Sequence, residues 1–141
     1  RALAKGAKGL TYYASGPEIA GTRYADDFTI YPRQWTEALK IASEVRHLAP
    51  VLAAGKPATT ARLEDAPAAI HFLELTRQGV HTLIAVNVER ERILANWRFD
   101  QPVQPQVLFE DRVLPGEAKV FTDLFQPLEV HIYQWKPGPP E

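Results

Sequence analysis

The 141-residue sequence predicts an α+β chain in which a short strand and one helix precede an antiparallel β-sandwich. Over residues 32–49, apolar residues recur at three- and four-residue spacing, which is typical of an amphipathic helix. From Ala68 onward the spacing changes to two, in short runs separated by turn residues. That pattern is typical of the strands of a sandwich.

The N-terminal third is predicted to contain one strand and one helix. Residues 1–6 have the character of a helix end that stops at Gly6, and Lys8–Ala14 is predicted as a strand because Thr and Tyr favour the pleated surface. A long loop is expected over 15–31. The helix over 32–49 is expected to end at Pro50, and its apolar stripe consists of Trp35, Ala38, Leu39, Ala42, Val45 and Leu48.

The rest of the chain is predicted as a linker followed by strands. Residues 53–67 are rich in Ala, Thr and Pro and are expected to form a linker between a unit over 1–52 and a sandwich over 68–136; residues 137–141 form a flexible tail. The first two strands are joined by a hairpin turn at Arg77-Gln78-Gly79. The expected strands are Ala68–Thr76, Val80–Val88, Arg92–Phe99, Gln106–Glu110, Arg112–Leu114, Ala118–Phe121 and Leu128–Trp135.

Composition excludes several classes of function. The net charge is −1, with no basic face of the kind that nucleic acid or an anionic membrane requires, and no apolar run reaches the roughly 20 residues of a membrane span. The absence of Cys excludes disulfides, thiolate zinc sites and cysteine nucleophiles. Because the chain also lacks Met and starts in a helix-like stretch at Arg1, it is expected to be a fragment or a processed chain.

Four segments, in order, carry a resemblance to a known family. They are Ala4–Tyr13, with its Gly-Ala-Lys-Gly run before an apolar-aromatic strand, Glu44–Leu52, Leu83–Asn87 and Phe125–Tyr133. Together they resemble the C-terminal end of bacterial β-galactosidase-like glycoside hydrolases. The resemblance implies that residues 1–52 are the last strand and helix of a (β/α)8 barrel, and that residues 68–136 are the C-terminal β-sandwich.

The same resemblance implies that this chain lacks the catalytic residues. Barrel glycosidases of this type place their two catalytic carboxylates after the fourth and seventh strands, neither of which lies in the chain, and hydrolysis needs both around one bond. The implied partners are the remainder of the barrel and a carbohydrate ligand, and homo-oligomers are left open. No cofactor is expected.

The candidate substrate-binding residues are Tyr13 and Glu18. Active sites of such barrels lie at the C-terminal ends of the strands, and alternation places Tyr13 on the inward side of Lys8–Ala14 at its last positions. The alternative is a Tyr packed in the barrel core. Glu18, Asp26 and Asp27 follow in the long loop, either near substrate or as solvated charges.

Other chemistry-bearing residues have a structural explanation beside the functional one. Trp97 and Trp135 are expected in the core, with a sugar-binding platform as the alternative, and Trp35 is also expected in the core. The histidines, His47, His71, His81 and His131, lack the spacing of metal ligands. Residues 89–92, Glu-Arg-Glu-Arg, are expected as a solvated turn. The rival hypothesis for the whole chain is a stand-alone sandwich module that binds carbohydrate or protein.

Overall fold

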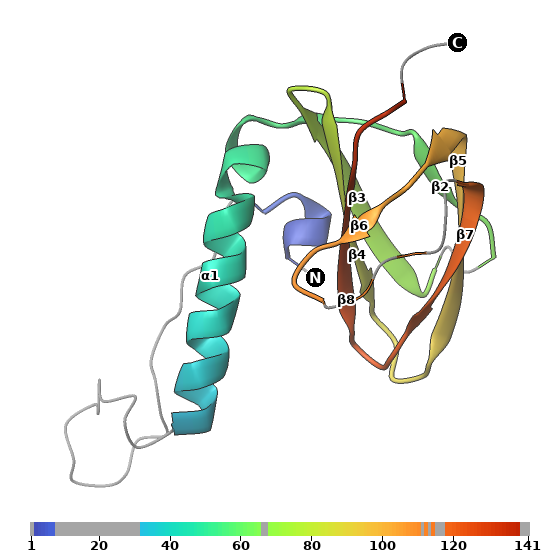
Figure 1. The fold of residues 1–141 in the computed structure, drawn as a ribbon. Helices are drawn as coiled ribbons and strands as arrows, with labels where there is room; N and C mark the ends of the chain where they lie inside the picture. Colours follow the sequence, from blue (N-terminus) through green and yellow to red (C-terminus); the bar gives the residue numbers. More distant parts are fainter. Residues whose placement is uncertain are drawn as a thin grey trace, which may run out of the picture. The chain divides into compact units, whose positions relative to one another are not determined.

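A computed structural model of the protein describes residues 2–7, 32–65, 68–110, 112, 114 and 118–138. The chain divides into two compact units, one made of Arg1–Lys8 with Pro50–Glu141 and the other of Gly9–Ala49. Tyr13 and the segment expected to form the strand Lys8–Ala14 lie outside the described residues, as does the loop over 15–31. Most of the described residues therefore belong to the first unit, which contains every strand found among them (Figure 1).

The sandwich consists of two antiparallel sheets. The five-stranded sheet has the order β1-β3-β4-β8-β6 and the three-stranded sheet the order β2-β5-β7. The strands are β1 (Lys56–Pro57), β2 (Ala61–Leu63), β3 (Ile70–Arg77), β4 (Val80–Asn87), β5 (Ile93–Val103), β6 (Gln106–Val107), β7 (Ala118–Phe125) and β8 (Val130–Trp135). The expected antiparallel sandwich is therefore confirmed as the architecture of this part of the chain.

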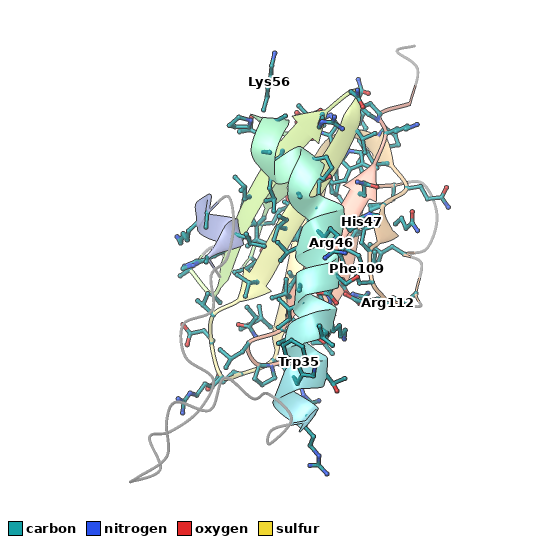
Figure 2. All side chains as sticks on the ribbon, turned by 90° about the vertical axis from the view of Figure 1, so that its left-hand side faces the viewer. Trp35, Arg46, His47, Lys56, Phe109 and Arg112 are labelled. Carbon is teal, nitrogen blue, oxygen red and sulfur yellow. The ribbon has the colours of Figure 1, made fainter. Side chains whose placement is uncertain are left out.

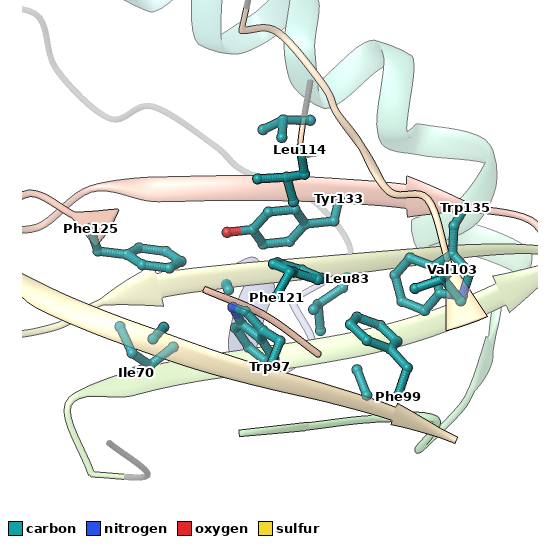
Figure 3. Packing of buried hydrophobic residues seen from close by; sticks show 14 residues of the cluster. Ile70, Leu83, Trp97, Phe99, Val103, Leu114, Phe121, Phe125, Tyr133 and Trp135 are labelled. Carbon is teal, nitrogen blue, oxygen red and sulfur yellow. The ribbon is translucent and has the colours of Figure 1, made fainter. Parts of the chain in front are cut away.

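Aromatic side chains from both sheets fill the space between them (Figure 3). Trp97, Phe125 and Tyr133 are fully buried there. Phe99 stacks on Phe121 with ring centroids 5.2 Å apart and meets Trp135 edge-on at 5.0 Å. Burying side chains of this size supplies most of the stability of a small sandwich, since each contributes about 2–3 kcal/mol.

The central strand β4 is buried on both faces. Leu83 and Ala85 point into the sandwich and are fully buried, while Ile84 and Val86 on the outer face are only 2% and 4% exposed. The 3-10 helix η1 (Leu3–Lys5) contacts β3 and β4 within the same unit. The five-stranded sheet thus has an apolar outer face as well as an apolar inner face.

The hairpin turn between β3 and β4 is confirmed. The register pairs Arg77 with Val80, which leaves Gln78 and Gly79 as the two turn residues, with φ of 52° and 75°. Positive φ at both central positions defines a type I′ turn, whose twist matches that of the flanking strands. Glycine adopts this conformation without strain, whereas glutamine does not.

The helix is longer than predicted. Helix α1 runs from Pro32 to Ala54, so Pro50 lies inside it rather than ending it. The proline ring removes one backbone hydrogen bond, but Val51 and Leu52, at 9% and 1% exposure, bury apolar surface in the turn after it. At the end of the helix, a Cβ on Gly55 would lie 2.4 Å from the Val51 carbonyl oxygen, so only glycine fits this close approach.

The apolar stripe of α1 is only partly buried. Leu48 is 2% exposed, but Trp35 and Leu39 are 39% and 51% exposed, so the expectation that Trp35 is a core residue is wrong (Figure 2). Periodicity identifies which side chains share a face of a helix, but it does not supply the surface that covers them. Among the described residues, no helix is both long and apolar enough to cross a membrane.

Two further segments differ from the prediction. Residues 53–67, expected as an irregular linker, contain the short strands β1 and β2. These strands have only two and three residues, too few for a period of two to be recognised. Arg112 and Leu114, expected in a strand, lie outside any strand. The side chain of Arg112 instead reaches Asp123 in β7.

Candidate functional site

The predicted substrate-binding residues fall outside what the structure describes. Tyr13 and Glu18, together with Asp26 and Asp27, belong to the undescribed segment 8–31, so their roles stay predictions. The alternative hypothesis of a sugar-binding platform formed by Trp97 and Trp135 is excluded. Trp97 and Trp135 are 0% and 4% exposed and belong to the core cluster, as expected, so neither offers a face to a sugar.

The first buried polar cluster centres on Glu74 in β3. Its carboxylate, which is almost completely buried, accepts hydrogen bonds from the Thr60 amide at 2.7 Å, the Thr60 hydroxyl at 2.6 Å and the Ala61 amide at 2.9 Å. His81 Nδ1 lies 2.7 Å from Glu74 Oε1, and its ring stacks on Trp135. These contacts fix residues 58–61, where the chain passes from one sheet to the other.

The second cluster centres on Asp123 in β7. Arg112 donates from Nη1 and Nη2 to the two oxygens of this carboxylate, each at 2.8 Å, and from Nε to Glu110 at 2.6 Å. The Tyr133 hydroxyl donates to Asp123 Oδ2 at 2.5 Å. Asp123 is 7% exposed, so this bidentate arginine is the main compensation for its buried charge.

The electrostatics of this cluster favour the neutral phenol and the charged guanidinium. Burial, together with the Asp123 carboxylate, raises the pKa of Tyr133 far above its ordinary value. The hydrogen bond to Asp123 likewise raises the pKa of Arg112. Tyr133 therefore acts as a permanent hydrogen-bond donor, and no proton-transfer role at neutral pH follows for it.

His131 extends this cluster toward the edge strand β7. Its Nδ1 lies 2.6 Å from Glu110 Oε1, and its Nε2 lies 3.3 Å from the Leu124 carbonyl oxygen. The Leu124 amide donates to Asp123 Oδ1 at 3.0 Å. The two backbone groups of Leu124 are thus occupied by side chains, which is one way in which natural proteins keep an edge strand from pairing with another chain.

Asn87, at the end of β4, joins two turns and is fully buried. Its amide nitrogen donates to the Glu91 carbonyl at 2.7 Å and to the Gln126 carbonyl at 2.9 Å, and its Oδ1 accepts from the Glu89 amide at 2.9 Å. The turns after β4 and β7 are therefore held together by one side chain. Asn87 ends Leu83–Asn87, one of the four segments that carry the family resemblance, but the sequence pattern does not indicate this role.

The buried clusters hold the fold together, and their geometry provides no exposed reactive group. The Glu74 and Asp123 carboxylates each accept several hydrogen bonds, and across the described ranges no group of three His, Asp or Glu side chains is arranged to hold a metal ion. The sequence signal for Glu74 and Asp123 is weak: each is an acidic residue among apolar neighbours, and the structure shows that each faces inward, opposite Leu83 and Ala95 respectively. Only burial distinguishes that pattern from a solvated edge.

Comparison with known proteins gives a likeness of fold. No protein-family model matches the sequence, and no curated protein matches it either. Among solved structures, an α-amylase from Anoxybacillus matches with a TM-score of 0.57 at 14% identity, covering 74% of this chain and 24% of the amylase. AmyP in complex with maltotriose matches with a TM-score of 0.58 at 12% identity, covering 74% of this chain and 22% of AmyP.

A third match is a GH27 β-L-arabinopyranosidase from Geobacillus stearothermophilus in complex with arabinose. It has a TM-score of 0.50 at 16% identity, and the likeness covers 75% of this chain and 25% of that enzyme. The chain thus spans about a quarter of the length of each of these proteins. Most of this chain therefore shares its fold with a part of several glycoside hydrolases.

Proposed function

We propose that the chain is the C-terminal part of a carbohydrate-active protein of the β-galactosidase-like barrel type. In this proposal, residues 1–52 contribute the last strand and helix of a (β/α)8 barrel, and residues 68–136 are an accessory sandwich that stabilises the barrel or mediates oligomerisation. The likeness of fold to parts of three glycoside hydrolases supports the carbohydrate-active class. The resemblance of the four sequence segments supports the finer assignment.

The single observation that carries the accessory role is the burial of β4 on both faces. A sandwich that works alone needs an apolar inner face only, and its outer faces alternate to polar residues. Here the outer residues Thr82, Ile84 and Val86 are all below 5% exposure, and Ile132 beside them on β8 is 7% exposed. In the chain by itself this face is already covered, and η1 contacts β3 and β4, which supports a sandwich that packs on a further layer of structure.

The coding sequence upstream of Arg1 provides the first test. We expect an open reading frame that continues upstream through seven further strand–helix repeats, with carboxylates after the fourth and seventh strands. An open reading frame that starts within a few codons of Arg1 contradicts the proposal and favours the rival hypothesis of a stand-alone sandwich module. This observation needs no folded fragment and separates the two hypotheses directly.

The second test is the activity of the chain by itself. We expect no hydrolysis of a panel of aryl glycosides by the purified 141-residue chain, because a glycosidase needs two carboxylates flanking one bond and the proposal places both elsewhere. The matched control is the full parent protein, assayed on the same panel. Turnover by the short chain that persists through repurification contradicts the proposal.

Tyr13 and Glu18 are proposed to face the sugar at the rim of the barrel. Alternation places Gly9, Thr11 and Tyr13 on the inward side of the expected strand, and Tyr13 is the one nearest its C-terminal end, where the active sites of such barrels lie. In the parent, Tyr13→Ala is expected to weaken ligand binding by about 1 kcal/mol or more with little change in melting temperature. The control Tyr12→Ala is expected to lower stability and to spare binding. The reverse result rules out this assignment.

A further inference from the structure

One end of the sandwich combines exposed leucines with exposed charges of both signs. The turns after β4 and β7 lie together at this end, shown at the bottom of Figure 1. We define the turn surface as residues 89–92 of the first turn, Leu128 of the second, and the adjoining cross-strand pair Leu94 and Leu124. The three leucines are 57%, 43% and 60% exposed in the order Leu94, Leu124, Leu128.

Hydrogen bonds join the two turns of the turn surface, although its residues are exposed. Asn87 bonds to the backbone of both turns, and the Leu128 amide donates to the Glu89 carbonyl at 3.2 Å. Leu128 has a φ of 61°, a left-handed conformation that is strained for a bulky residue. A solvated turn has no need of a leucine in this position, where asparagine or glycine would fit without strain.

The charges of this surface are self-complementary. Glu89, Arg90, Glu91 and Arg92 are all exposed, and no ion pair joins any of them to another residue in the described part of the chain. Residues 89–92 have the sequence Glu-Arg-Glu-Arg, so a second copy of this segment that runs antiparallel to the first presents the order Arg-Glu-Arg-Glu. Two copies related by a two-fold axis therefore place each glutamate opposite an arginine, as an isologous interface requires.

We propose that the turn surface is the interface of a homodimer. The Glu89–Arg92 segments of the two copies run antiparallel, so that Glu89 faces Arg92 and Arg90 faces Glu91. The leucines of the surface form the apolar centre of the contact, and the charges form its rim. Preorganisation by Asn87 reduces the entropy lost on association. This inference concerns the sandwich alone and does not depend on a missing barrel.

Sedimentation velocity of the 141-residue chain tests the proposal over a concentration series from about 1 μM to about 1 mM. We expect a reversible monomer–dimer equilibrium. Two charge variants are each expected to be monomeric, because their turns repel their own copies: Arg90→Glu with Arg92→Glu, and Glu89→Arg with Glu91→Arg. An equimolar mixture of the two variants is expected to restore the dimer as a heterodimer.

Leu128→Asn separates the interface from the fold. Asparagine tolerates the left-handed conformation, so the melting temperature is expected to stay level or rise while self-association weakens by about tenfold or more. Lys136→Glu, just beyond β8 at the other end of the sandwich, is the control and is expected to dimerise as the unchanged chain does. A chain that stays monomeric throughout overturns the proposal. So does dimerisation that survives in either charge variant or in Leu128→Asn, or a variant mixture that stays monomeric.

Discussion

Arg112 binds Asp123 through both terminal nitrogens of its guanidinium group, each 2.8 Å from a carboxylate oxygen. This pair joins the segment after β6 to the edge strand β7, and it lies beside the buried hydroxyl of Tyr133. Because Asp123 is nearly buried, the loss of its arginine leaves a charge that water reaches poorly.

We therefore expect Arg112→Ala to lower the free energy of unfolding by about 2–3 kcal/mol. Urea denaturation at neutral pH measures the effect. The control is Arg62→Ala, which removes an exposed ion pair to Asp100 and is expected to cost less than about 1 kcal/mol. Equal losses from the two substitutions contradict a special role for Arg112.

Glu74→Gln is expected to destabilise the protein by about 2–3 kcal/mol, although the two side chains have nearly the same shape. The Glu74 oxygens accept hydrogen bonds from donors on Thr60 and Ala61, and the amide group of glutamine directs its own donors at some of them. Glu64→Gln at the exposed partner of Arg98 is the control, with an expected change below about 0.5 kcal/mol. Unfolding curves for both variants test the difference, and equal losses contradict it.

Tyr133 is expected to make stability fall at alkaline pH. Its pKa is raised in the folded protein, so its contribution is complete below the unfolded value of about 10 and is lost as the pH rises above that value. Tyr133→Phe cannot ionise. The difference in unfolding free energy between the unchanged chain and Tyr133→Phe should therefore shrink between about pH 9 and about pH 11. A difference that stays constant over this range rules out the explanation.

The hairpin turn offers a stabilising substitution. Gln78 has a φ of 52°, which costs a side chain other than Asn or Gly about 1 kcal/mol. Gln78→Asn is expected to raise the free energy of unfolding by about 0.5–1 kcal/mol and to raise the melting temperature. Gly79 has a φ of 75°, a conformation in which alanine is strained. Gly79→Ala is therefore the control with the opposite sign and is expected to lower the free energy of unfolding by about 0.5–1 kcal/mol. The prediction fails if Gln78→Asn lowers the melting temperature.

Local sequence rules were sufficient for much of the sandwich. The turn at 77–79 and the inward face of β5, with Ala95, Trp97 and Phe99, follow from turn chemistry and a period of two. The same rules predicted the strand Val80–Val88, which is β4, but not that both of its faces are buried, because a continuous apolar run has no alternation that marks one face. The buried clusters around Glu74 and Asp123 were missed for a related reason, since an acidic residue on a strand gives no sign of its partners.

The sequence by itself determined the order of one helix and an antiparallel sandwich, the hairpin turn at Gln78 and Gly79, and the core position of Trp97 and Trp135. These features depend on neighbours within a few residues or on side-chain size, which a linear pattern records. Only the tertiary structure decided that Pro50 stays inside α1, that Asn87 joins two turns, and that Glu74 and Asp123 are buried. Each of these depends on contacts between residues far apart in the chain, where burial energy and hydrogen bonding outweigh local preference.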